Sequence, residues 1–365
     1  MKPFIIPLFI PQLGCPQQCI YCDQKAATGA DPYPKESLFP ETIRKWLSYK
    51  KKTPPPSQIQ IAFYGGSFTS LSLQDQSRLL ALVHPFLLDN TAGSLRISAR
   101  PDSITEEILT LLWDSGVRTV ELGAQSLDAE VLRLSGRGYK PETVCRSVEL
   151  LRAWNFEIGL QLMPGLPGDS REKFVQTVEE TVRLRPGFTR IYPAIVLKGT
   201  QLERLYKKGD YSPLTLEEAV DWCAEGVSRF RAADIGVIRR GLQPTESIRS
   251  EANVVAGPFH PAFGQLVESR IALARMIALF SGLKINKKIS SKKNFTFLVP
   301  ARELSNYRGQ HNGNLAKLRG HFGKEFEILA DPNITVPELN AHGGLFSPRT
   351  AWRGGGATKG KQNYK

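Results

Sequence analysis

The chain has no long hydrophobic run, and we do not expect its first residues to be a secretory signal; each observation argues against a class of protein. None of its apolar stretches approaches the ~20 residues that cross a membrane as a helix. Residues 1–7 carry one charge, and proline interrupts their apolar stretch, which is typical of a first strand rather than a signal peptide. We therefore expect a cytoplasmic protein with no membrane partner, whose cysteines stay reduced.

Acidic residues are also in short supply. Asp and Glu number 35 against 48 Lys and Arg, which gives a formal net charge of +13. Such an excess favours an anionic partner, and nucleic acid is the commonest one. The basic residues concentrate in residues 284–293 and in the C-terminal tail. An ordinary solvated basic surface is the alternative, because net charge is only a compositional signal.

Only five cysteines are present, and three of them form a short motif. Cys15, Cys19 and Cys22 have C-x3-C-x2-C spacing, whereas Cys145 and Cys223 lie in helical patterns as small core residues. Three thiolates on one loop can bind three corners of a cubane iron–sulfur cluster and leave the fourth iron open to a small molecule. A disulfide would leave an odd thiol, and a zinc site would need a fourth ligand from a distant segment. The five histidines form no ligand-like cluster.

Apolar strands alternate with amphipathic helices through residues 1–245, which predicts an α/β fold. The expected strands, whose near-continuous apolar runs suit a buried parallel sheet, are residues 4–10, 58–64, 95–99, 119–122, 157–163 and 189–196. The expected helices, identified by their apolar periodicity, are residues 40–50, 72–88, 105–113, 141–154 and 170–184. Repeated right-handed βα units curl into a parallel barrel. Six units predict an incomplete (β/α)6 barrel.

The remaining sequence predicts a small, basic α+β domain followed by a tail. Residues 246–341 have an ordinary domain size, with helices expected at 263–280 and 312–322 and strands at 295–299 and 326–329. One group of residues in this domain favours an ordinary basic surface, with RNA contacts as the alternative. They are Arg302, Tyr307, Arg308, His311, Lys317 and Arg319. Residues 342–365 are Gly-rich and basic, so we expect them to be disordered.

The candidate functional residues follow the predicted strands. The cysteine motif follows the first strand, Gly65 and Gly66 the second, Gln125 the fourth and Gly165 the fifth. Because the carboxyl ends of parallel strands share one edge, we expect these segments to meet at one barrel mouth.

Charged and amide side chains in the predicted strands and loops are further candidates. Glu121 lies on a buried strand and needs a partner or a polar cavity. Arg100 and Arg137 could pair with it, or they could hold a ligand carboxylate. Gln161 could point into the mouth or away from it.

These motifs together resemble those of the radical S-adenosylmethionine (radical SAM) superfamily. An aromatic residue, Tyr21, precedes the last cysteine, and Tyr64–Thr69, Glu121–Ser126 and Met163–Gly168 resemble the later motifs in family order. The resemblance covers residues 4–245 and implies a radical SAM barrel. It also implies a [4Fe–4S] cluster, held by Cys15, Cys19 and Cys22, and SAM. The residues it places around these cofactors are Tyr21, Gly65, Gly66, Ser67, Arg100, Glu121, Gln125, Ser126, Arg137, Gln161 and Gly165.

The resemblance implies an enzyme that uses one electron to cleave SAM to methionine and a 5′-deoxyadenosyl radical. This radical then abstracts a hydrogen atom from a substrate. The resemblance assigns no catalytic side chain beyond the cofactor ligands. The electron has to come from outside, and a flavodoxin or ferredoxin is the expected donor. The protein's share is to position the cofactors and to exclude water.

Within the superfamily, the sequence is most similar to the catalytic subunit of Elongator, a tRNA-modifying enzyme. Arg100–Asp102, Val120–Ser126, Arg137–Tyr139 and Ile191–Leu202 resemble its core, and Ile238–Gln243 resembles its next basic strand. This similarity makes tRNA a candidate substrate. The chain departs from that family in its shorter first cysteine gap and in Tyr139, which replaces a histidine. No acetyltransferase domain follows, so we do not expect acetyl-CoA to be used.

Oxygen-independent coproporphyrinogen III oxidases are the second similar group. The cysteine spacing, Gln125-Ser126 and Gly165–Gly168 fit this group, but its aromatic and histidine motif before the first cysteine is absent, and Gln161 replaces an expected Asp. A coproporphyrinogen oxidase-like enzyme is therefore an alternative. A non-catalytic iron–sulfur or RNA-binding protein and a zinc-binding module are the other two.

Overall fold

The structure is a computed structural model that describes residues 3–10, 13–15, 19–23, 35–49, 54–242, 253–283, 294–340 and 345–346. The chain divides into two units, Met1–Phe263 and Gly264–Lys365. The lysine-rich residues 284–293 and nearly all of the predicted tail lie outside the described residues. In the part that is described, no helix combines the length and apolar character needed to cross a membrane.

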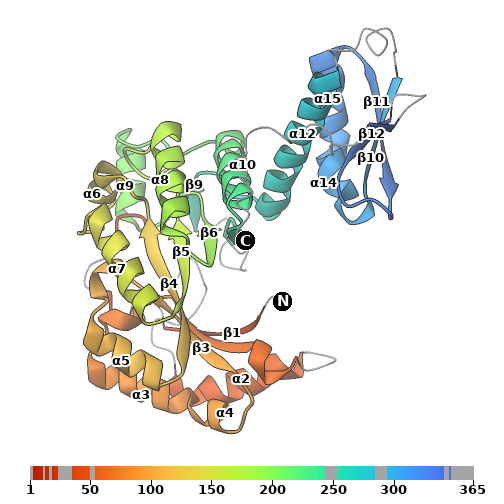
Figure 1. Ribbon diagram of the computed structural model, residues 1–365. Coiled ribbons are helices and arrows are strands. Elements are labelled where there is room, and N and C mark those ends of the chain that lie inside the picture. The colour runs from red at the N-terminus through yellow and green to blue at the C-terminus, as the bar shows by residue number, and fades with distance from the viewer. Residues whose placement is uncertain are drawn as a thin grey trace, which may run out of the picture. The chain divides into compact units, whose positions relative to one another are not determined.

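The first unit is a curved, all-parallel sheet with helices on its outer side (Figure 1). Its seven strands follow in the order β1-β2-β3-β4-β5-β6-β8. They are β1 Phe4–Phe9, β2 Ile59–Tyr64, β3 Ser94–Ala99, β4 Val117–Gln125, β5 Glu157–Leu162, β6 Phe188–Ile191 and β8 Gly236–Arg240. Among the described strands, β1 and β8 are the two open edges, so the barrel is incomplete, as predicted. β8 is the basic strand that only the family resemblance indicated.

Helices connect the strands, and most of them begin at a polar cap. They are α2 Phe39–Ser48, α3 Leu73–Val83, α4 Pro85–Leu88, α5 Glu106–Asp114, α6 Ala129–Leu134, α7 Pro141–Ala153, α8 Arg171–Leu184, α9 Gln201–Lys208 and α10 Leu216–Ala232. Thr105 is the N-cap of α5, where its side chain accepts the N–H of Ile108 and satisfies one otherwise unpaired donor. The single helix expected at 72–88 is two helices, and Pro85, which has no N–H to donate, begins the second.

A two-stranded ribbon adds to the sheet of the first unit. β7 (Val196–Leu197) pairs antiparallel with β9 (Val254–Ala256). Val196 is fully buried in a small apolar cluster that also contains Cys19 and Tyr21 of the cysteine loop. The ribbon therefore supports the loop that carries the candidate metal ligands.

The second unit is a small α+β fold. Its elements are α12 Phe263–Leu283, which starts at the last residue of the first unit, β10 Asn294–Pro300, α14 Leu304–Arg308, α15 Gly313–Phe322, β11 Glu325–Asp331, β12 Glu338–Asn340 and β13 Leu345–Phe346. The sheet order is β11-β10-β12-β13, and its helices pack around phenylalanines such as Phe280, Phe295 and Phe326. Tyr307 is completely buried in this core, so the expectation that it could stack a base was wrong.

Candidate active site

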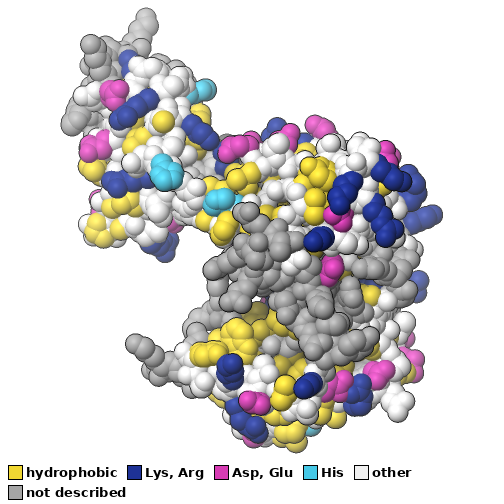
Figure 2. Space-filling view, turned by 180° about the vertical axis from the view of Figure 1, so that it is seen from behind, with side chains coloured by type: hydrophobic (Ala, Val, Ile, Leu, Met, Phe, Trp, Pro, Cys, Tyr) yellow, Lys and Arg dark blue, Asp and Glu magenta, His cyan; other side chains and the backbone are white. Residues whose placement is uncertain are grey.

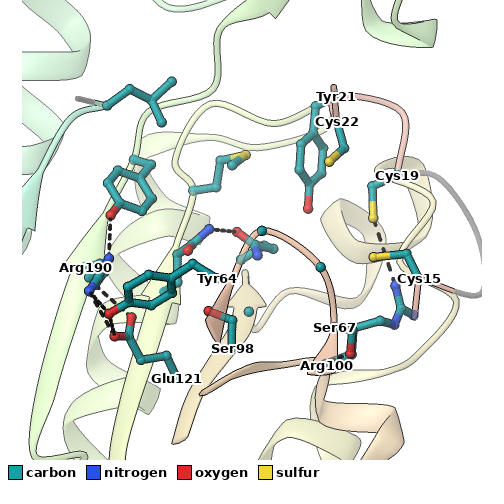
Figure 3. Close-up of a pocket in the computed structure, with 18 of the residues that line it drawn as sticks. Cys15, Cys19, Tyr21, Cys22, Tyr64, Ser67, Ser98, Arg100, Glu121 and Arg190 are labelled. Atoms are coloured by element: carbon teal, nitrogen blue, oxygen red, sulfur yellow. Dashed lines mark hydrogen bonds and ion pairs between the residues drawn. The ribbon is translucent and has the colours of Figure 1, made fainter. Parts of the chain in front are cut away.

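The carboxyl ends of the strands surround a cavity of about 730 Å³ (Figure 3). Its lining includes most of the residues predicted to hold cofactors, namely Cys15, Cys19, Tyr21, Cys22, Gly65, Gly66, Ser67, Arg100, Glu121, Gln125, Arg137 and Gln161. Ser126 and Gly165 are not among the lining residues. Figure 3 shows two different ends, with the three thiols at one and a group formed by Tyr64, Glu121 and Arg190 at the other.

The cysteine loop is folded tightly against its neighbours. Cys22 donates its N–H to the carbonyl of Cys19 at 3.0 Å, and Ile20 donates to the carbonyl of Ser135 at 3.4 Å. Cys19 is buried, whereas Cys15 and Cys22 are partly exposed. The loop is therefore anchored by its backbone, and its thiols are left facing the cavity.

The glycine motif after β2 lets the cysteine loop pass at very close range. A Cβ on Gly66 would lie 2.1 Å from the carbonyl oxygen of Leu13 and 2.8 Å from that of Ile10. Ser67 donates its N–H to the same Leu13 oxygen at 3.1 Å. Since backbone atoms cannot yield as a flexible side chain can, Gly66 is needed for the loop geometry whether or not it also contacts a ligand.

Two arginines lie beside the buried thiol. Arg137 Nη1 is 3.1 Å from Cys19 Sγ, and Arg100 Nη1 is 4.0 Å from it. Arg137 is fixed from behind, because its Nη2 donates to the Gly123 carbonyl at 2.6 Å and to the Tyr139 hydroxyl at 2.6 Å. Arg100 pairs with Asp102 at 2.7 Å. The thiol end thus carries positive charge, which suits thiolates and an anionic ligand.

The chemistry of the three thiols fits a metal cluster. Burial, followed by repulsion from Cys19 and Cys15, raises the pKa of Cys22 to about 12. Thiolates packed this closely repel one another, and bound metal relieves that repulsion by selecting the deprotonated form. Within the described residues, no three His, Cys, Asp or Glu side chains converge on one metal ion. A cubane cluster does not need that convergence, because it binds each cysteine at a different iron.

Glu121 lies at the other end of the cavity, and its partners differ from those expected. Its carboxylate accepts from Arg96 Nη1 at 2.7 Å and pairs with Arg190 Nε at 2.7 Å, instead of with Arg100 or Arg137. The Tyr64 hydroxyl donates to Glu121 at 2.7 Å. Burial, with the nearby Glu121 charge, raises the pKa of Tyr64, so this phenol remains a donor.

Arg96 extends this network below the cavity. Its side chain is almost completely buried, donates from Nε to Gln60 at 2.9 Å and lies over the ring of Phe188. Sequence reasoning missed Arg96 and Arg190 as site residues. The available signal was that both are charged residues within strands expected to be buried, the same argument that singled out Glu121.

A β-bulge aims Gln125 into the cavity. The pairing of β4 with β5 shifts register between Leu122 and Gln125, and Gln125 has a left-handed φ of 67°. Bulges beside functional sites commonly redirect a side chain in this way. Gln161, whose direction the sequence left open, lines the cavity and donates to Gln125 Oε1 at 3.3 Å. Ser126 instead faces α8, where its hydroxyl lies 3.3 Å from that of Thr177.

The turn after β5 is held from both sides. The Gly165 N–H donates to Asp169 Oδ2 at 2.8 Å, and the Gly165 carbonyl accepts from the Tyr211 hydroxyl at 2.7 Å. Burial raises the pKa of Asp169 to about 6, although its hydrogen bonds from the Gly165 and Ser170 N–H groups oppose the shift. Gly165 is therefore fixed in its left-handed conformation beside the cavity.

Comparison with protein families agrees with this geometry. Residues 9–181 match the radical SAM superfamily, and residues 186–272 match the C-terminal domain of radical SAM proteins. The chain belongs to the radical SAM superfamily. Enzymes of this superfamily use a [4Fe–4S] cluster and SAM, so these are its cofactors and the protein is an enzyme.

The similar proteins include tRNA-modifying enzymes. A tRNA uridine(34) acetyltransferase from Dehalococcoides mccartyi is 31% identical over 235 residues, covering 55% of this chain and 50% of that protein. Human Elongator complex protein 3 is 24% identical over 241 residues, covering 55% of this chain and 44% of its own length. The chain thus spans about half the length of the curated relatives it matches.

A solved structure supports the fold. The archaeal Methanocaldococcus infernus Elp3, with an N-terminal deletion, superposes with a TM-score of 0.56 at 22% identity. The match covers 74% of this chain and 63% of the archaeal one. At this level of identity the similarity establishes only the shared fold. The substrate and the reaction have to be inferred from the residues of the cavity.

Proposed function

We propose that this protein cleaves SAM reductively, abstracts a hydrogen atom from its substrate, and acts on tRNA. The observation that carries the proposal is the cavity itself, in which three thiols at one end face a polar group at the other. The two ends suit two different occupants, a cofactor at the thiols and a substrate near Tyr64, Glu121 and Arg190. The Elongator-like relatives and the net charge of +13 support tRNA as that substrate.

Cys15, Cys19 and Cys22 are the residues that would hold the cluster. Arg137 and Arg100 are suited to an anionic group at the same end, and the backbone of Gly65 and Gly66 to the amino end of SAM. The bound, reduced cluster supplies the electron that splits SAM into methionine and a 5′-deoxyadenosyl radical. The chain's own share is to orient SAM, exclude water and hold the substrate's hydrogen within reach.

The second end of the cavity is built for a polar substrate group. Arg190 Nη2 donates to the Tyr64 hydroxyl at 2.9 Å, and its Nη1 donates to the Tyr192 hydroxyl at 3.2 Å. Because Glu121 holds both Arg190 and Tyr64, these two side chains offer a rigid polar surface that needs no rearrangement when a nucleobase binds. An external one-electron donor, a flavodoxin or ferredoxin, completes the system.

A product analysis tests the substrate assignment. The enzyme, reconstituted with iron and sulfide and reduced with dithionite, is incubated with SAM and bulk tRNA, and the tRNA is digested to nucleosides for mass spectrometry. The expected result is a new nucleoside mass, together with 5′-deoxyadenosine in excess of that formed without tRNA. The Cys19→Ala variant should give neither. Unchanged nucleosides and tRNA-independent 5′-deoxyadenosine would reject tRNA as the substrate.

A further inference from the structure

Helix α9 packs directly against the cysteine loop. The N–H of Leu202, in the first turn of α9, donates to the carbonyl of Ile20 at 2.8 Å. Leu202 is completely buried in the apolar cluster that contains Cys19 and Tyr21, and Leu205 packs against the same cluster. The inner face of α9 is therefore in direct contact with the loop that carries the cluster ligands.

The outer face of α9 is basic. Arg204, Lys207 and Lys208 are exposed and lie at the helical spacing that places side chains on one side, and Lys198 is exposed just before the helix. Lys207 pairs with Glu203 at 2.8 Å, and Lys198 also helps to lower the pKa of that carboxyl group. Among the residues that the structure describes, Arg204 and Lys208 form no ion pair. Figure 2 shows Lys and Arg side chains gathered over the part of the surface where α9 lies.

Helix stability explains only part of this charge. Basic residues in the last turn interact favourably with the helix dipole, and Lys207 and Lys208 lie there. Arg204 is in the middle of the helix and Lys198 precedes it, so neither gains from that interaction. A basic face extending beyond the last turn is better explained by an anionic partner.

We propose that the outer face of α9, formed by Lys198, Arg204, Lys207 and Lys208, docks the acidic one-electron donor that reduces the cluster. The inference rests on the proposed function, because reductive cleavage of SAM requires an electron from another protein. A helix with its side chains is about 10–12 Å across, so a donor on this face lies about one helix diameter from the cysteine loop. One electron leaves the reduced donor and enters the cluster, and no bond is made or broken.

The same face could in principle attract tRNA, and the contacts favour the donor. The inner face of α9 touches the cysteine loop, which is where reduction takes place, and a substrate would have to reach the opposite end of the cavity, near Glu121. A protein donor that docks on this basic face would have to present an acidic surface around its cofactor. Complementary charge of this kind accelerates encounter and makes the rate depend on salt.

Charge reversal on α9 tests the docking surface. The double variant R204E/K208E is compared with K45E/R146E, which changes the net charge equally at exposed positions on α2 and α7. Cluster reduction by a reduced flavodoxin is followed by stopped-flow absorbance at several salt concentrations. We expect R204E/K208E to be reduced about tenfold more slowly at low salt, with the difference disappearing at high salt. The K45E/R146E control should behave like the wild type.

Dithionite separates this inference from the proposed function. Because dithionite needs no docking surface, R204E/K208E should make 5′-deoxyadenosine with dithionite at the wild-type rate. Equal flavodoxin-driven rates in the two double variants would overturn the docking surface. Weaker tRNA binding by R204E/K208E, with unchanged reduction by flavodoxin, would assign the face to RNA instead. Failure of the wild type to make 5′-deoxyadenosine with dithionite would reject the proposed function itself.

Discussion

Arg137 Nη1 lies 3.1 Å from Cys19 Sγ, so a fully charged guanidinium borders a cluster ligand that is 118 residues away in the sequence. Hydrogen bonds to cysteine sulfur and nearby positive charge both stabilise the more negative, reduced form of an iron–sulfur cluster. Because the Gly123 carbonyl and the Tyr139 hydroxyl hold the guanidinium in place, the contact does not depend on a flexible side chain.

We predict that Arg137→Gln lowers the reduction potential of the cluster, since the variant loses the charge and the N–H···S contact together. The midpoint potential is measured by a redox titration followed by electron paramagnetic resonance, with SAM absent so that its binding cannot contribute. Arg133→Gln, an exposed change in the neighbouring helix α6, is the control and should leave the potential unchanged. Equal potentials in all three proteins would show that the contact does not affect the cluster.

Gly66→Ala should damage the cysteine loop. The added methyl group would overlap the carbonyl of Leu13, so the loop or β2 has to move, at a cost of ~1–3 kcal/mol. We expect lower iron and sulfide content after reconstitution and a lower free energy of unfolding. The matched control is Gly236→Ala, where no atom lies within 4 Å of the new Cβ. Full iron content in Gly66→Ala would mean that the close approach is not required.

Glu121→Ala tests whether this carboxylate stabilises the folded protein when no ligand is bound. Removing it leaves Arg96 buried without its ion partner, and breaking a buried pair in this way costs ~3–5 kcal/mol. Tyr64→Phe removes only a neutral donor and should cost ~1 kcal/mol. Urea denaturation of the apoprotein measures both. If Glu121→Ala leaves the apoprotein's stability unchanged, the residue serves a ligand rather than the barrel.

Asp169 should make stability depend on pH. Its pKa in the folded protein is about 6 against an ordinary value of 3.8, so the folded protein holds this proton more tightly than the unfolded chain. The resulting contribution is fully present below pH ~4 and is lost as the pH rises through ~6, to a limit of ~3 kcal/mol.

The variant Asp169→Asn cannot titrate and isolates this contribution. Its free energy of unfolding is subtracted from that of the wild type at several values between pH 4 and 8. We expect the free energy of unfolding of the wild type to fall relative to that of Asp169→Asn as the pH rises from 4 through ~6, and the difference to level off about one pH unit above that. A difference that does not change with pH would show that Asp169 titrates normally.

Much of the barrel could be predicted because buried parallel strands leave apolar runs in the sequence. The runs at Ile59–Tyr64 and Glu157–Leu162 were located to within a residue or two. The convergence of Cys19 and Gly66 also followed from sequence, since strand order and the shared carboxyl edge bring the loops after β1 and β2 together. β8 left almost no signal of its own, because an exposed edge strand with two arginines lacks the apolar run.

The partners of Glu121 could not be read from the sequence. These partners are the residues of β3 and β6 that point inward beside Glu121 of β4. Register shifts next to Leu95 and Thr189 change which residues those are. The hydrogen bond from Tyr211 to Gly165 is equally hidden, since it joins residues that lie 46 positions apart in the chain. Such contacts depend on three-dimensional packing and leave no local pattern.

The central claim is that three cysteines, Cys15, Cys19 and Cys22, support reductive cleavage of SAM. The most direct measurement is the amount of 5′-deoxyadenosine formed per protein under anaerobic conditions, with dithionite and SAM, after reconstitution with iron and sulfide. The account predicts formation by the wild type and none by Cys19→Ala, whereas Cys223→Ala, a change in the core of α10, stays active. A wild type that carries a full cluster and forms no 5′-deoxyadenosine would contradict the account.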